Sequence, residues 1–229
     1  ENNKLIDLIE EYPTRLREDP SHYISVINNQ IFACGMLRRY NEVNENLEKL
    51  KSVQAKTVDD SFKIFTQYYL NKLILHTESG DFKTGKEIIN NREREKVHFK
   101  KQIFQENFHL LYAYIYFGSK DYEEASIWLN KLLDMPKTIV RQDLQSVARI
   151  INLIVHFEIG NNLLLESLLR STYRYLRKQD RFHEFESRIL KFIRKSKDLA
   201  TKRELKVAFV ELKVELKNEE KKGRFLIFF

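Results

Sequence analysis

Apolar residues recur every three to four positions through most of this 229-residue chain, and the pattern is broken at nearly constant intervals. The breaks are short polar segments, most of them with glycine or asparagine. They align on Tyr40, Phe82, Tyr122 and Asn162, in steps of 42, 40 and 40 residues. A spacing of three and four is typical of amphipathic helices. Each break therefore joins two helices into a hairpin, and a fixed period of this size is typical of an α-solenoid.

The pattern predicts an all-α fold, an α-solenoid of about five antiparallel helical hairpins. Gly or Asn is expected to supply the left-handed residue that ends the first helix of a hairpin, and Asp or Asn to cap the second. The predicted pairs are 21–37 with 41–52, 59–79 with 82–92, 101–117 with 121–134, 138–159 with 161–178, and 181–195 with 198–221.

One more helix is predicted before these pairs, over residues 1–18. It should end at Asp19-Pro20, because the residue before proline resists helical geometry. The domain prediction is therefore an N-terminal helix within 1–20, a repeat domain over 21–195, and a C-terminal capping helix with an apolar tail over 196–229. All three parts are expected to form one continuous solenoid.

The stretch 109–136 carries the best-defined repeat. Its first helix has a small residue and an aromatic three positions later, and its second helix opens with an acidic residue, an aromatic, two polar residues and alanine. This stretch resembles a tetratricopeptide repeat. The segment 21–195 is similar to that family, with one good repeat and three degenerate ones of about 40 residues instead of about 34. The longer period leaves HEAT-type and other helical-hairpin solenoids open. The matching residues are Ala113, Tyr116, Asp121-Tyr122-Glu123-Glu124-Ala125, Leu129, Leu132-Leu133 and Pro136.

The resemblance implies a right-handed superhelix whose first helices line a concave groove for a peptide or a segment of another protein. Several amides fall on the first helices without a matching set of Lys and Arg. An extended neutral segment therefore fits better than a C-terminal carboxylate. The alternative is that these amides are ordinary solvated positions. The candidate groove residues are Asn28, Asn29, Gln67, Asn71, Asn107 and Tyr114.

Charge is distributed unevenly along the chain. Residues up to Ser167 include 22 basic and 24 acidic side chains, and those from Leu168 onward include 18 and 9, so the end of the chain supplies the whole excess behind the net charge of +7. On the predicted helix 161–178, one stripe is apolar and the opposite stripe is basic, with no interleaved carboxylate. The apolar stripe is Leu165, Leu168, Leu169, Thr172 and Leu176; the basic face is Arg170, Arg174, Arg177, Lys178 and Arg181.

The basic face has two interpretations. Five cations on one face attract nucleic-acid phosphates or an acidic protein surface. The alternative is a solvated face that Glu184 and Glu186 of the next helix partly neutralise. No helix-turn-helix, RNA-recognition or zinc-finger pattern accompanies the face, so the sequence does not choose between them.

The last predicted helix repeats Leu205, Phe209, Leu212 and Leu216 at heptad-like spacing over about three heptads. We interpret it as the helix that caps the solenoid; the alternative is pairing with a second copy or a partner helix. The apolar tail Phe225–Phe229 is expected to pack on the body, on a partner or on sequence outside this chain. Because the chain begins at Glu1, we expect a processed protein or a piece of a longer one.

The amino-acid composition excludes several classes of protein and of site. With 16 Phe, 11 Tyr, six Gly and three Pro, the chain is a folded one and not a turn-rich sheet protein. The single cysteine excludes a disulfide framework and a multi-cysteine zinc site. Cys34, next to Ile31, Phe32 and Met36, is expected to be a buried inert thiol. His76 and His156 occupy positions of a packing aromatic and are expected to be structural.

No motif supports catalysis. The six histidines lack metal-ligand spacing, the glycines are scattered singly, and no nucleophile motif occurs. We therefore expect no enzymatic activity, no cofactor and no metal. The sequence has no signal-peptide pattern and no apolar run of 18 residues, which favours a cytoplasmic protein without a membrane partner.

Three hypotheses for function remain. The first is a protein-interaction scaffold or adaptor that binds a partner segment in the groove. The second is a nucleic-acid-associated or regulatory factor that uses the basic face. The third is the peptide-sensing half of a regulator.

Overall fold

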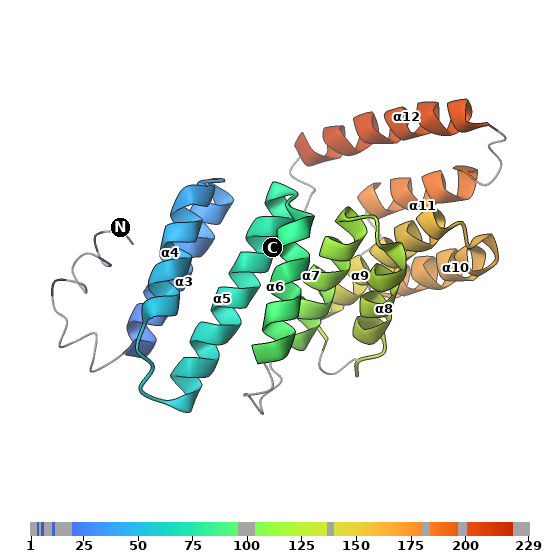
Figure 1. Ribbon diagram of the computed structural model, residues 1–229. Helices are drawn as coiled ribbons and strands as arrows, with labels where there is room; N and C mark the ends of the chain where they lie inside the picture. The colour runs from blue at the N-terminus through green and yellow to red at the C-terminus, as the bar shows by residue number, and fades with distance from the viewer. Residues whose placement is uncertain are drawn as a thin grey trace. The chain divides into compact units, whose positions relative to one another are not determined.

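The computed structural model describes residues 20–95, 104–136, 140–179, 184–196 and 201–221, with Lys4, Ile6 and Glu11. Every regular element in these ranges is a helix, ten in all, so the prediction of an all-α chain is confirmed for them (Figure 1). Of the helix expected over 1–18, Lys4, Ile6 and Glu11 are described, each in helical conformation, and the rest lies outside the described residues, as does the tail Phe225–Phe229. The helices are α3 (Pro20–Met36), α4 (Tyr40–Ser52), α5 (Val58–Ser79), α6 (Phe82–Glu95), α7 (Gln105–Gly118), α8 (Tyr122–Leu133), α9 (Gln142–Ile159), α10 (Asn162–Lys178), α11 (Glu184–Ser196) and α12 (Lys202–Lys221).

The turns follow the predicted chemistry only in part. Gly80 and Gly160 end α5 and α9 in the left-handed conformation, with φ of 74° and 78°. Arg38 and Lys120 take the same role at the other two turns, where the prediction of Gly or Asn was wrong. The turn after α7 shows why this is tolerated: the amide of Asp121 donates to the carbonyl of Tyr116 at 2.9 Å, which satisfies a helix-end acceptor.

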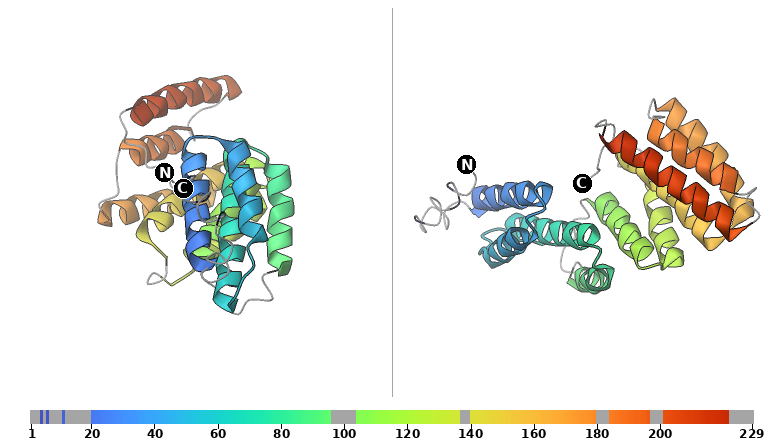
Figure 2. Two further views of the ribbon diagram at one scale, coloured as in Figure 1. Left: turned by 90° about the vertical axis from the view of Figure 1, so that its left-hand side faces the viewer. Right: turned by 90° about the horizontal axis from the view of Figure 1, so that it is seen from above.

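The chain divides into two compact units, residues 1–104 and 105–229, which are described separately. In unit 1, α4 packs between α3 and α5, α5 packs on α6, and α3 also contacts α5. In unit 2, the first helices α7, α9 and α11 contact one another in order, and α8 and α10 each contact the first helices before and after them (Figures 1 and 2). Within each unit, side chains of one first helix therefore lie near those of the next.

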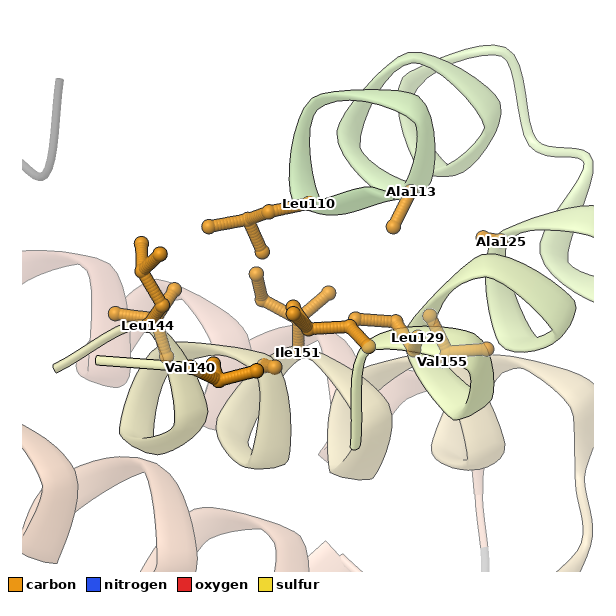
Figure 3. Packing of buried hydrophobic residues seen from close by; sticks show 11 residues of the cluster. Leu110, Ala113, Ala125, Leu129, Val140, Leu144, Ile151 and Val155 are labelled. Atoms are coloured by element: carbon orange, nitrogen blue, oxygen red, sulfur yellow. The ribbon is translucent and has the colours of Figure 1, made fainter. Parts of the chain in front are cut away.

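Close helix packing in unit 2 depends on small residues. Ala113 of α7 and Ala125 of α8 are fully buried where these helices meet. Leu129 of α8 and Ile151 of α9 fill the space beside them (Figure 3). The core is contiguous across α7, α8 and α9, so each of these helices is held in place by its neighbours.

The last helix, α12, packs on α11 (Figure 2). Leu205, Leu212 and Leu216 contact the second apolar cluster of unit 2. Phe209 is partly exposed, although its ring lies 4.6 Å from that of Phe192 on α11, centroid to centroid. The heptad positions predicted for this helix therefore face the body of unit 2.

Candidate interaction surfaces

Two of the predicted groove residues meet in unit 1. Asn28 lies on α3 and Asn71 on α5, 43 residues apart in sequence, and Asn71 Nδ2 donates to Asn28 Oδ1 at 2.9 Å. The same amide nitrogen also donates to the backbone carbonyl of Gln67 at 2.8 Å. Both protons of the Asn71 amide are thus used inside the protein. Among the described residues, no hydrogen-bond partner is found for Asn71 Oδ1 or Asn28 Nδ2.

The asparagine pair belongs to a larger surface. Asn28 and Phe32 are one helical turn apart, as are Gln67 and Asn71, so each pair lies on one side of its helix. We name this surface the first-helix face of unit 1. It comprises Ser25, Asn28, Phe32 and Met36 on α3, and Lys63, Gln67 and Asn71 on α5.

The apolar part of this face was missed in the sequence. Phe32 and Met36 are 58% and 66% exposed, although the sequence suggested an apolar environment around Cys34. Only the thiol and Ile31 are buried there. A spacing of four, from Asn28 through Phe32 to Met36, is the signal that places these residues on one side of a helix.

The expected burial of Cys34 is confirmed. Its side chain is buried, and Gln30 Nε2 donates to its sulfur at 3.4 Å. Burial raises the pKa of the thiol, and the nearby negative charge of Glu42 raises it further. Because the thiolate is the reactive form, this environment favours an inert thiol.

Two of the predicted groove residues lie in unit 2. Asn107 and Tyr114 are both on α7, seven residues apart and half-buried. Tyr114 packs against the apolar cluster of this unit, and burial raises the pKa of its hydroxyl to about 12. Part of the Tyr114 side chain therefore belongs to the core. Asn29, on α3, is exposed.

The basic face is exposed along α10 but is not free of carboxylates. Arg170, the first cation of the face, forms an ion pair with Glu166, 2.9 Å apart and one turn earlier on the same helix, which partly neutralises this end of the face. Arg177 donates to the hydroxyl of Tyr173 at 3.1 Å. No carboxylate of the described residues pairs with Arg174, Arg177 or Lys178. Arg181 lies outside the described residues.

The opposite side of α10 also agrees with the sequence. Leu165, Leu169, Thr172 and Leu176 are buried, and Leu168 is half-buried. The polar side chain of Thr172 is the exception to an otherwise apolar set. The predicted division of this helix into two faces is thus confirmed.

Two cations of α11 lie close to carboxylates of α11 and α12. Arg188 pairs with Glu184 on its own helix at 3.0 Å and with Glu215 of α12 at 2.7 Å. Lys195 lies 4.0 Å from Glu211 of α12. Glu184, one of the two carboxylates expected to neutralise the basic face of α10, therefore forms an ion pair with Arg188 of its own helix.

His76 and His156 occupy packed positions, as predicted. His156 is buried on α9, and burial lowers the pKa of its imidazole. His76 is half-buried, and its Nδ1 lies 3.3 Å from Asp81 Oδ2. Burial lowers the pKa of His76 more strongly than the Asp81 carboxylate raises it. Both imidazoles are therefore disfavoured as cations.

Comparison with known proteins adds no assignment: no family model, curated protein or solved structure matches this chain. In the part of the chain that the structure describes, no three His, Cys, Asp or Glu side chains are grouped as a metal site. None of the described helices combines the length and apolar character needed to span a membrane. The surfaces above are therefore interpreted from their own chemistry.

Proposed function

We propose that this protein is a non-catalytic interaction module, a degenerate tetratricopeptide-like array of helical hairpins that binds an extended partner segment. The binding surface proposed is the first-helix face of unit 1. The observation that carries this proposal is the asparagine pair, which leaves the Asn28 Nδ2 donor and the Asn71 Oδ1 acceptor without a hydrogen-bond partner among the described residues.

A peptide group is the natural complement of such a pair. Every non-proline residue of an extended segment offers one N–H donor and one C=O acceptor. The Asn28 amide matches a carbonyl, and the Asn71 oxygen matches an N–H. One turn along α3, the exposed ring of Phe32 offers an apolar contact for a partner side chain, and Met36 follows. Large exposed apolar side chains with polar neighbours are typical of interaction sites.

Replacing Asn28 with Asp tests this proposal without breaking the asparagine pair. The carboxylate keeps an oxygen that accepts from Asn71 Nδ2, but the outward donor becomes a second acceptor, which repels a partner carbonyl. Loss of one hydrogen bond with an added unfavourable contact should weaken binding about tenfold or more. The measurement is fluorescence anisotropy with a labelled peptide selected against the protein from a random 12-residue display library.

The matched control is Asn44→Asp, which makes the same charge change at an exposed position of α4. It should leave the affinity within about twofold of the original. Urea unfolding of both variants checks that neither has lost stability. Equal affinities of Asn28→Asp and Asn44→Asp for the selected peptide would count against the proposed surface.

The second candidate function is nucleic-acid binding through α10. The observation that favours it is that Arg174, Arg177 and Lys178 are exposed, close together, and without a carboxylate partner in the described ranges. Cations in this arrangement attract phosphates, and their contribution falls as salt concentration rises.

Arg174→Glu combined with Arg177→Glu should weaken binding of a labelled 20-nucleotide single-stranded RNA by about tenfold or more at low salt. The slope of log affinity against log salt should also become shallower, by about 1 for each phosphate that the variant no longer binds. Lys213→Glu with Lys217→Glu on α12 makes the same change in net charge and is the control. If both double variants bind the RNA equally weakly, net charge and not the basic face is responsible.

A further inference from the structure

Unit 1 contains an open cavity of about 270 Å³ on a different side of α5 from the asparagine pair. The asparagine pair joins α5 to α3, whereas this cavity is bounded by the end of α4, the segment that follows it, α5, and the end of α6. The cavity is smaller than the roughly 300–1,000 Å³ of pockets that take drug-sized ligands. Its size suits a single large side chain.

The cavity wall is mainly aromatic and aliphatic. Tyr68 and Tyr69 are buried, and their ring centroids lie 5.3 Å apart with the planes nearly perpendicular. Phe65 packs on Tyr69, with centroids 5.0 Å apart. Val53 and Ile64 add aliphatic surface. Such a wall favours an apolar or aromatic guest, because aromatic rings gain from edge-on and offset contacts.

Positive charge around the rings disfavours a cationic guest. Lys51 Nζ lies 5.2 Å from the centroid of the Tyr68 ring, and Lys72 Nζ lies 4.9 Å from it. The guanidinium of Arg92 lies 5.9 Å from the centroid of Phe65. The protein's own cations thus already use the attraction that an aromatic cage would offer to an ammonium group.

The rim of the cavity carries a cation, Lys51, and a carboxylate, Glu95, which differ in their contacts. The Glu95 carboxylate interacts with the Tyr69 hydroxyl, whose pKa is raised by burial and then by Glu95. Lys51 is exposed, and its ammonium group has a contact with the Tyr68 ring but no carboxylate partner among the residues described. A partner carboxylate therefore has a complementary charge available at the rim.

From this we infer a second peptide-anchor site, in which the cavity takes a large apolar side chain of a partner segment while Lys51 pairs with an adjacent Asp or Glu side chain. The partner chemistry is an acidic–apolar dipeptide unit within a protein chain. This site does not depend on the first-helix face, so it extends the proposed module to a partner that contacts two sides of α5.

The experiment uses the whole protein and three dipeptides, N-acetyl-Asp-Trp-amide, N-acetyl-Asn-Trp-amide and N-acetyl-Asp-Ala-amide, followed by ¹H–¹⁵N correlation spectra. The Asp-Trp probe should shift the amide signals of Val53, Ala55 and Ser61, which line the cavity. The Asn-Trp probe should bind about two- to fivefold more weakly, as the loss of one exposed ion pair implies. The Asp-Ala probe should cause no shift at these residues.

Lys51→Glu should abolish the preference for Asp over Asn, while the control Lys83→Glu, at an exposed position near the start of α6, should preserve it. Asn28→Asp should leave dipeptide binding unchanged. The dipeptide experiment can therefore fail while the test of the first-helix face succeeds, and the reverse is also possible. The proposal is overturned if the Trp probes shift no cavity signals, or if the Asp preference persists in Lys51→Glu.

Discussion

Leu129→Ala should destabilise unit 2 by about 2–5 kcal/mol, the range for truncating a fully buried leucine. Leu129 is fully buried in the cluster shared by α7, α8 and α9 (Figure 3). Truncation removes apolar packing between α8 and the cluster that it shares with α7 and α9, and it leaves a cavity. Because α7 and α8 are already close together at Ala113 and Ala125, they have little room to move in and fill this cavity. The whole unit, and not α8 alone, should therefore be destabilised.

The measurement is urea unfolding followed by tryptophan fluorescence. Trp128 is the single tryptophan of the chain and its ring packs against Tyr112 at 4.7 Å between centroids, so its emission reports on unit 2. Ile127→Ala is the matched control, because Ile127 is on the same helix, has the same number of side-chain carbons and is 45% exposed. It should cost less than about 1 kcal/mol. A cost of Leu129→Ala no greater than that of Ile127→Ala would contradict the packing described here.

Thr57→Ala should destabilise unit 1 by about 0.5–2 kcal/mol at neutral pH, through loss of a helix cap. Thr57 Oγ1 accepts from the backbone amide of Asp60 at 3.0 Å, and Asp60 accepts in return from the Thr57 amide, also at 3.0 Å. Asp60 also accepts from Ser21 of α3 at 3.0 Å. The capping box of α5 therefore also joins the two first helices of unit 1.

This cap should lose its effect in acid. The pKa of Asp60 is lowered chiefly by the hydrogen bond from the Thr57 hydroxyl, which donates to Asp60 Oδ2 at 2.8 Å. The hydrogen bond from Ser21 lowers this pKa by a smaller amount, and burial acts in the opposite direction. A carboxyl whose pKa is lowered by folding stabilises the folded state above its ordinary pKa of about 3.9, and this contribution is lost as the pH falls through the lowered value. The difference between the original protein and Thr57→Ala should thus be largest above pH ~4 and shrink below it.

Urea unfolding followed by far-ultraviolet circular dichroism, at a series of pH values, measures this difference. The transition seen by Trp128 separates unit 2 from unit 1. Ser79→Ala, which removes an exposed hydroxyl at the other end of α5, is the control and should show no such pH dependence. A constant difference for Thr57→Ala from pH 7 to pH 3 would show that Asp60 does not act through this cap.

The helices were predictable because each depends on its own sequence. Apolar periodicity located the hairpins, and glycine marked the ends of α5 and α9, where φ is positive. After α3 and α7 the residue with positive φ is Arg38 or Lys120 and not a glycine, although Gly118 is the last residue of α7; the turn satisfies helix-end carbonyls in both cases. Local sequence preferences are weak where several backbone hydrogen bonds fix the turn.

The candidate surfaces were less predictable because they depend on which helices are neighbours. Periodicity placed Asn28 and Asn71 on first helices, but their hydrogen bond needs the contact between α3 and α5. The exposure of Phe32 depends in the same way on what lies beside α3. The pairing of Arg170 with Glu166, by contrast, joins residues one turn apart and was available from the sequence.

The cavity in unit 1 is the extreme case. Its walls come from α4, the following segment, α5 and α6, so no single stretch of sequence carries its signal. From the sequence, Tyr68 and Tyr69 resemble ordinary core aromatics. Only the packing of three helices shows that they border an open space.

The central claim, that a partner segment binds the first-helix face of unit 1, is tested most directly by mapping a bound peptide on the protein. The measurement is a ¹H–¹⁵N titration with the display-selected peptide, following the side-chain amide signals of Asn28 and Asn71 and the backbone signals of α3 and α5. The prediction is that both side-chain signals shift together with Phe32 and saturate at the peptide's dissociation constant. Shifts confined to α10, with the Asn28 and Asn71 signals unchanged at saturation, would contradict the claim.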